Sequence, residues 1–173
     1  MASFTATLAR IAFGPPPNIL CDEGIWRAGV AELRRRTGGR RESGAFLLGS
    51  KGRARRIDEF VFYDDIDPNA LKTGSVKIDG RCLGDLWALC RKTGRAVMAD
   101  VHVHPGGFAQ SDSDRANPII AEVGHIAIII PHYAARATIP GHIGVYEYRG
   151  DRQWRDHSFD HWSLLHVGWW PWY

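Results

Sequence analysis

Two histidines and an aspartate at short spacing are the residues of this sequence best suited to chemistry. Residues 101–114 read VHVHPGGFAQSDSD, so one residue separates His102 from His104. On a β-strand, residues two apart point to the same side, and the two imidazoles would project together. Beyond the Pro-Gly-Gly turn, Asp114 can add a carboxylate oxygen. The pattern predicts one zinc per chain, held by two imidazoles and one carboxylate.

Three protein ligands predict a catalytic zinc site. A structural zinc has four protein ligands, whereas three leave one position open for water or substrate. The histidine pair by itself is weak evidence, because two histidines can simply lie on the face of a strand. The prediction therefore depends on the carboxylate and on a base near the pair.

Glu42 is the candidate general base. It is the single acid among nine Lys and Arg residues between 34 and 56, and it comes just before the apolar run GAFLLG at 44–49. Such a run predicts a buried central strand. If that strand lies beside the histidine strand, Glu42 comes within reach of a water at the metal. The alternative is a surface acid that pairs with Arg40 or Arg41 and contributes little.

Ser111 is the candidate donor to the oxyanion of a tetrahedral intermediate. It lies three residues before Asp114. A serine at this position also suits the N-cap of a short helix that carries the aspartate, and the two roles are compatible.

The elements that must position these residues follow helical and strand patterns. An apolar stripe predicts a helix over 23–37, with Asp22 as its N-cap and Gly38 after its C-terminus. The other elements are predicted, in chain order, as strands 6–13, 44–49 and 55–63, a loop at 64–74, a brief strand at 76–78, a helix at 81–93, strand 96–104, a short helix from Asp112 to near Pro118, and strands 125–130, 143–148 and 153–155. This order predicts an α+β fold (an α/β sandwich) with a mixed β-sheet flanked by helices.

Length and composition favour a single domain over residues 1–173. The chain has 173 residues and 45% hydrophobic content, enough for one sizeable core. The core is expected at about 20–148. The tryptophan-rich tail at 159–173 either completes this core, which we favour, or forms an aromatic patch for a partner.

Several sequence features predict a cytoplasmic protein. No apolar run approaches the roughly 20 residues that span a bilayer. The N-terminus lacks the basic and apolar regions of a secretory signal. The three cysteines have no paired spacing, so a disulfide framework is not expected.

The charge pattern does not predict nucleic-acid binding. The net charge is +3, with a basic stretch at 34–56 and an acidic stretch at 58–67. The basic stretch lacks interleaved aromatic residues and matches no nucleic-acid-binding motif. We interpret it as a solvated helix end and hairpin.

The sequence resembles the JAB1/MPN/Mov34 (JAMM) zinc metalloproteases, including the prokaryotic deubiquitinase-like members. Three matches carry the resemblance, in chain order: Glu42 followed by GAFLLG, the segment His102-Val-His104-Pro105, and Ser111-x-x-Asp114. The resemblance implies an MPN/JAB fold with a cytidine deaminase-like architecture. It also implies that the two histidines and the aspartate bind zinc, that the glutamate is the base, and that the serine assists the oxyanion.

One spacing departs from the signature. The serine usually follows the second histidine by eight residues, whereas Ser111 follows His104 by seven. Loops absorb such deletions easily. Ser113 therefore stays an alternative for the oxyanion role, and Asp112 an alternative to Asp114.

The resemblance also implies a substrate. Members of the family act on ubiquitin-like proteins or their conjugates, and prokaryotic members occur near E1-like and E2-like proteins. The hypothesis is a peptidase or isopeptidase that cleaves after a ubiquitin-like C-terminal tail, which would enter beside Gly106-Gly107. The alternatives are a peptidase for small amino-acid conjugates and a non-catalytic assembly scaffold.

Overall fold

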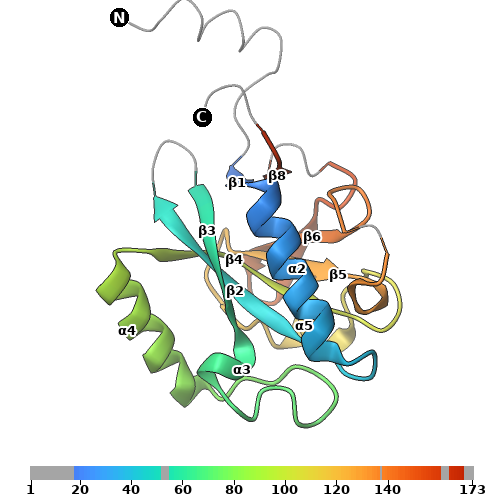
Figure 1. Cartoon of the computed structure of the whole chain (residues 1–173), viewed down its shortest axis with the longest axis horizontal. Coiled ribbons are helices and arrows are strands. Elements are labelled where there is room, and N and C mark those ends of the chain that lie inside the picture. The colour runs from blue at the N-terminus through green and yellow to red at the C-terminus, as the bar shows by residue number, and fades with distance from the viewer. Residues whose placement is uncertain (1–17, 52–54, 137, 161–163, 170–173) are drawn as a thin grey trace, which may run out of the picture.

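Eight strands form one mixed β-sheet in the part of the chain that the structure describes (Figure 1). The computed structural model describes residues 18–51, 55–136, 138–160 and 164–169. The strand order is β7-β6-β5-β4-β2-β3-β1-β8. With helices packed on the sheet, this confirms the predicted α+β class. The predicted strand at 6–13 lies outside the described residues.

The elements follow the predicted order closely around the candidate site. The strands are β1 (Ile19–Cys21), β2 (Gly44–Lys51), β3 (Arg55–Phe62), β4 (Ala96–Val103), β5 (Ile126–Ile130), β6 (Gly144–Gly150), β7 (Gln153–Asp156) and β8 (Leu165–Val167). The helices are α2 (Glu23–Thr37), α3 (Tyr63–Ile66), α4 (Leu83–Thr93) and α5 (Asp112–Ala116), with 3₁₀ turns η1 (Gly80–Cys82) and η2 (His132–Ala134). The β4–β5, β1–β3 and β1–β8 pairs are parallel, and the other pairs are antiparallel.

Helix α2 begins and ends where its capping residues predict. The Asp22 side chain accepts hydrogen bonds from the backbone N–H groups of Gly24 and Ile25. Gly38 ends the helix in the left-handed conformation, with φ of 53°. Such a conformation costs a residue with a Cβ more than it costs glycine.

Alternation along the strands divides the core between the two faces of the sheet. On β2, Leu47 packs in the cluster that includes the buried side of α2, whereas Phe46 and Leu48 pack with Leu86 of α4. Strand residues alternate between faces, so the two helices cover opposite sides of the sheet. In Figure 1, α2 crosses one side and α4 lies apart from it. The α4 side is the one that carries the site.

Two predictions between residues 63 and 78 are wrong. Residues 63–66 form a single helical turn, α3, instead of a strand end and loop. Val76 and Ile78 are not in a strand. The N–H of Val76 donates to the Glu42 carboxylate, and the N–H of Lys77 donates to a carbonyl of the same loop. The N–H of Glu42 in turn donates to the carbonyl of Gly74, so the segment pairs with Glu42 and with its own loop instead of forming a strand.

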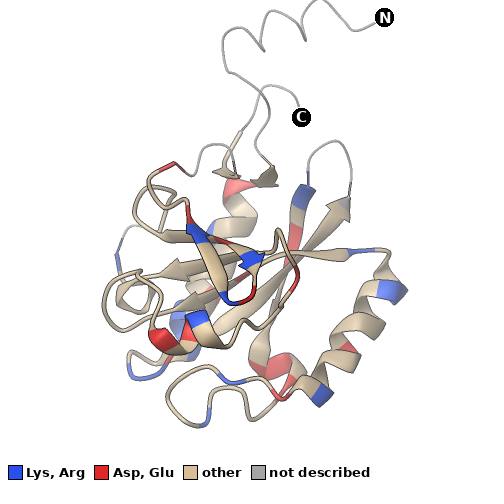
Figure 2. Ribbon diagram, turned by 180° about the vertical axis from the view of Figure 1, so that it is seen from behind, with Lys and Arg blue, Asp and Glu red and all other residues tan. Residues whose placement is uncertain are grey.

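The basic and acidic stretches meet in the structure. Arg36 lies 2.6 Å from Asp64 and 2.8 Å from Asp65, and its guanidinium covers the ring of Phe62 at 4.1 Å. Acidic and basic segments are intermingled on the face shown in Figure 2. Part of the basic stretch is thus neutralised by its own chain.

The described part of the C-terminal segment joins the sheet. Strand β8 pairs with β1 in parallel, and Leu164 and Leu165 are buried. Trp169 is exposed. The three cysteines are free thiols. Among the described residues, no helix combines the length and the apolar composition that a membrane span requires.

Candidate metal centre

Strand β4 carries the two histidines to the α4 side of the sheet. It lies between β2 and β5, and its residues Val101 and Val103 pack in the core on the α2 side. His102, between them in sequence, therefore projects to the opposite side. His104 follows directly after the strand, and its N–H donates to the carbonyl of Ile130 at the end of β5. Both histidine side chains are largely buried.

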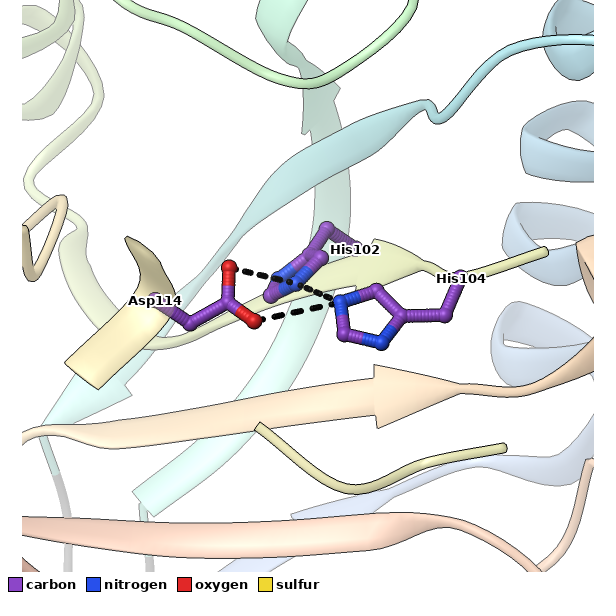
Figure 3. Close-up of side chains that lie close together, drawn as sticks. All are labelled: His102, His104 and Asp114. Atoms are coloured by element: carbon purple, nitrogen blue, oxygen red, sulfur yellow. Dashed lines mark hydrogen bonds and ion pairs between the residues drawn. The ribbon is translucent and has the colours of Figure 1, made fainter. Parts of the chain in front are cut away.

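The predicted ligands converge on one point. The Nε2 atoms of His102 and His104 are 2.9 Å apart. The Asp114 carboxylate oxygens lie 3.5 Å from His102 Nε2 and 3.3 Å from His104 Nε2. Figure 3 shows the carboxylate on α5 facing both imidazoles. The three ligand atoms all lie within 4.8 Å of one another, close enough to share one ion.

His102 is a buried histidine whose two ring nitrogens are not both paired by hydrogen bonds. Its Nδ1 is buried and has no hydrogen-bond partner among the described residues. Its polar contacts there are all made through Nε2, with His104 and Asp114. An imidazole that serves only packing would be expected to pair both nitrogens. A metal-bound imidazole also usually donates from its second nitrogen, so the ligand role is supported by the position of Nε2 beside His104 and Asp114 and not by the unpaired Nδ1.

The electrostatic field at the site favours a cation. Burial would lower the pKa of His102, but the bond to Asp114 and the charges of Asp114, Asp100 and Glu42 outweigh burial and raise this pKa. Burial would raise the pKa of Asp114, but hydrogen bonds from His102, His104 and Ser111 hold it far below its ordinary value. The negative charges of Asp114, Asp100 and Glu42 near the imidazoles stabilise a positive ion between them.

A capping box fixes Asp114. The Ser111 hydroxyl accepts a hydrogen bond from the Asp114 N–H, and the Asp114 carboxylate accepts from the Ser111 N–H. The Ser111 hydroxyl also lies 2.7 Å from Asp114 Oδ2. This reciprocal arrangement holds the first turn of a short helix and aims the carboxylate at the histidines. Asp112 is exposed and lies outside the ligand cluster.

Glu42 reaches the site through the pairing of β2 with β4. Gly44 lies opposite His102, and the carbonyl of Ser43 accepts from Val103, so the chain before β2 runs alongside His104. Glu42 is half-buried, and its Oε2 accepts the N–H of Val76 at 3.0 Å. Oε1 has no hydrogen bond within the described chain. The role of Glu42 as base required the strand that follows it to lie beside the histidine strand, and β2 does pair with β4.

A buried network beneath the site was not predicted from the sequence. Asp100 accepts hydrogen bonds from the Tyr63 hydroxyl at 2.8 Å and from His125 Nε2 at 2.6 Å. All three residues are buried. Burial and the Asp100 charge raise the pKa of Tyr63 well above its ordinary value, which keeps the phenol protonated as a donor. Residues two apart on a strand point to the same side, so the spacing of Asp100 and His102 on β4 could have indicated that Asp100 lies at the site.

A cleft opens next to the ligand cluster. It has a volume of about 650 Å³, and its lining includes His102, Asp114 and Asp100. Its other walls come from loop 76–80, from α5 and the following residues, and from Trp154 of β7. Ser113 lines this cleft, whereas Ser111 and the glycine pair 106–107 are outside its lining. Both candidate serines therefore lie at the site, but with different surroundings.

Comparisons with known proteins agree with this class of site. No family model matches the sequence. The probable metalloprotease y4jG of Sinorhizobium fredii is 25% identical over 65 residues, which are 38% of this chain and 40% of that protein. The chain thus matches less than half the length of this relative.

One solved structure shows the same fold, and a second has a lower TM-score. The solution structure of DSY2949 from Desulfitobacterium hafniense has a TM-score of 0.62 at 15% identity, covering 86% of this chain and 92% of that one. AF2198, a JAB1/MPN domain protein from Archaeoglobus fulgidus, has a TM-score of 0.47 at 18% identity, covering 86% of this chain and 95% of that one. The chain is similar to the JAB1/MPN/Mov34 metalloproteases in the residues of its site, and its α+β fold is of the class that this resemblance implies.

The residues present fit a zinc ion. Two imidazole nitrogens and one carboxylate oxygen are ligands that zinc prefers, and a set of three is typical of catalytic sites. The 2.9 Å between the two Nε2 atoms is closer than two lone pairs tolerate without a proton or a cation between them. When bound, zinc would lower the pKa of water and polarise a carbonyl group.

The purified protein is expected to contain about one zinc per chain, held by His102, His104 and Asp114. His104→Ala removes one of the three ligands, so zinc is lost. The exposed His142 lies outside the cluster, and His142→Ala serves as the matched control. Elemental analysis measures the zinc. Because an ion that binds only the folded state stabilises it, a chelator should lower the Tm of wild type and of the control but not of His104→Ala. Equal zinc in all three proteins would contradict the assigned ligands.

Proposed function

We propose that this protein is a zinc-dependent peptidase that hydrolyses an amide bond, with Glu42 as its general base. The observation that carries the proposal is the convergence of His102, His104 and Asp114 beside the strand that follows Glu42. The local similarity to a probable metalloprotease supports the same class of reaction. A scaffold protein has no need for an intact set of ligands and a base, so we favour an enzyme.

Glu42 is arranged to hold and transfer a proton. The N–H of Val76 occupies Oε2 and fixes the orientation of the carboxylate. Oε1 is left to take a proton from the attacking water. As the water oxygen bonds to the amide carbon, that proton passes to Glu42. Glu42 then gives it to the leaving nitrogen as the carbon–nitrogen bond breaks, which restores the carboxylate.

A serine hydroxyl is proposed to stabilise the oxyanion of the tetrahedral intermediate. Ser111 is the serine of the signature, although its hydroxyl lies against Asp114. Ser113 lines the cleft and lies two residues after Ser111, in the first turn of α5. The loop that is one residue short makes the two serines competing candidates.

For the substrate, we propose a ubiquitin-like protein or its conjugate, cleaved after the C-terminal tail. The JAMM-like signature supports this choice. Partners of the same pathway would be E1-like and E2-like proteins, and the reaction would take place in the cytoplasm. The second candidate is a peptidase for small amino-acid conjugates, which the volume of the cleft favours, since pockets of roughly 300–1,000 Å³ hold small ligands.

Glu42→Gln should retain zinc and the wild-type Tm but lose turnover by about 10²–10⁴-fold, because an amide cannot accept the proton. The expected loss is in kcat. The exposed Glu122 provides the control, and Glu122→Gln should keep wild-type kcat. Steady-state hydrolysis, with zinc measured in the same samples, tests this. A Glu42→Gln protein that turns over at the wild-type rate would remove Glu42 from the mechanism.

Ser111→Ala should lower kcat by about 10²–10³-fold with zinc retained, the usual loss for one oxyanion donor. It should also lower the stability by about 1 kcal/mol, because the helix loses its N-cap. Ser113→Ala should change kcat only mildly. Parallel kinetics and thermal melts of the two variants distinguish the serines. The reverse pattern of kcat would transfer the oxyanion role to Ser113.

A folded ubiquitin-like fusion should be cleaved with a higher kcat/KM than its isolated C-terminal peptide. Contacts of the fusion body with the charged stretches at 34–56 and 58–67 would orient the substrate and speed its encounter. Kinetics at moderate salt compare the two substrates. Preference for the short peptide would favour the amino-acid-conjugate peptidase.

A further inference from the structure

The cleft beside the ligand cluster is larger than a thin glycine tail requires. Its volume is about 650 Å³, and its lining includes His102 and Asp114. A chain of glycines that passed through would leave most of its walls in contact with water. The sequence had suggested that Gly106 and Gly107 make room for such a tail, but these glycines are not part of the lining. The cleft therefore suits a side chain of some size.

One part of the cleft wall is apolar and packs against the core, beside polar residues that include Lys77 and Asn117. Val76, Ile78, Leu83 and Ile119 line it, and each is half-buried against the cluster of side chains beneath α4. Their exposed halves form a hydrophobic surface within the cleft. Covering such surface stabilises a complex by about 25 cal/mol for each Å² removed from water. The favoured occupant is accordingly apolar.

Trp154 lines the cleft and is held in place. Its indole N–H donates to the carbonyl of Arg115 at 3.2 Å, and its ring packs edge-on against Tyr148 at 5.0 Å. The indole therefore joins β7 to α5 and presents a fixed aromatic surface. Such a wall favours an aromatic or branched side chain, because aromatic rings gain from contact with other rings.

Gln110 provides a polar group that lacks a partner. It is 8% exposed and lines the cleft, yet its carboxamide makes no hydrogen bond with any described residue. Its nitrogen and oxygen are not among the fully buried side-chain atoms that lack a partner, so they are accessible from the cleft and free to pair with a ligand. The NH₂ of a carboxamide can donate to a peptide carbonyl, and its oxygen can accept from a peptide N–H. The cleft thus combines an apolar wall with a group that can bind a backbone.

We propose that this cleft binds a bulky apolar side chain, aromatic or branched, in the residue next to the scissile bond, and that Gln110 hydrogen bonds the adjacent peptide group. The inference rests on the proposed peptidase function, since it assigns the substrate of that same site. A glycine-ended tail meets the requirement only if the apolar residue lies on the other side of the bond.

The test fills the cleft with a side chain. A Cβ added at Gly80 or at Gly84 would meet no atom within 4 Å, but only Gly80 lines the cleft. Gly80→Phe should narrow the cleft, and Gly84→Phe is its matched control. The substrates are blocked peptides with Phe, Leu or Gly at each side of the scissile bond. Wild type should prefer Phe or Leu over Gly at one side by about 10-fold or more in kcat/KM. Gly80→Phe should abolish that preference, and Gly84→Phe should keep it.

A second variant tests the amide. Gln110→Leu should raise KM for the Phe peptide by about 10-fold with an unchanged Tm, because the wild-type carboxamide has no partner to lose. An unchanged KM would overturn the role of Gln110. Three outcomes would overturn the proposed cleft specificity: equal kcat/KM for Phe, Leu and Gly peptides, a preference for Gly at both sides, or identical behaviour of the two glycine variants.

Binding separates this inference from the proposed function. The zinc-loaded Glu42→Gln protein is titrated calorimetrically with the same blocked peptides. Tighter binding of the Phe peptide than of the Gly peptide supports the inference even if wild type hydrolyses no peptide, a result that would refute the peptidase function alone. Hydrolysis by wild type together with equal binding of the two peptides would refute the inference alone.

Discussion

The pairing of β2 with β4 sets the position of Glu42 relative to His102 and His104. Its register places Gly44 opposite His102. Because the strands are antiparallel, Glu42, two residues before Gly44, lies near the end of β4 where His104 follows. Gly44 itself has no room for a side chain, because a Cβ there would lie 2.1 Å from the ring of Tyr63 and 2.8 Å from the carbonyl of Val101. A slip of one residue would turn His102 toward the α2 side of the sheet. The close packing at this glycine and the apolar residues on both faces of β2 oppose such a slip.

Paired polar groups make the floor of the site rigid. Asp100 is buried on the same side of β4 as His102, and it is held by Tyr63 and His125. A buried carboxylate without such partners would be costly, whereas a satisfied network fixes the surrounding geometry. Asp100 also adds negative charge near the imidazoles. The same residues thus stabilise the fold and favour a cation at the site.

The loop at 67–79 both contacts the general base Glu42 and lines the cleft. Asp67 is buried, and its carboxylate accepts from the N–H groups of Asn69 and Asp79, which ties the two ends of the loop together. Between them, Val76 donates to Glu42 and also lines the cleft. A substrate side chain in the cleft would therefore press on the segment that orients the general base. Recognition and proton transfer share this short piece of backbone.

The sequence by itself determined the local features: the caps and apolar stripe of α2, the strand that carries His102 and His104, and the capping serine before Asp114. These depend on neighbours in the chain, so spacing and residue type are sufficient to predict them. Tertiary structure decided which distant segments meet. Alternation on β4 places Asp100 beside His102, but no periodic signal indicates its partners Tyr63 and His125. The same holds for the short strands β1 and β8, because each pairing depends on contacts between segments far apart in sequence. Residues 76–78 were misassigned for the same reason: their pattern resembles a strand, but the Glu42 carboxylate, not a neighbouring strand, binds the N–H of Val76.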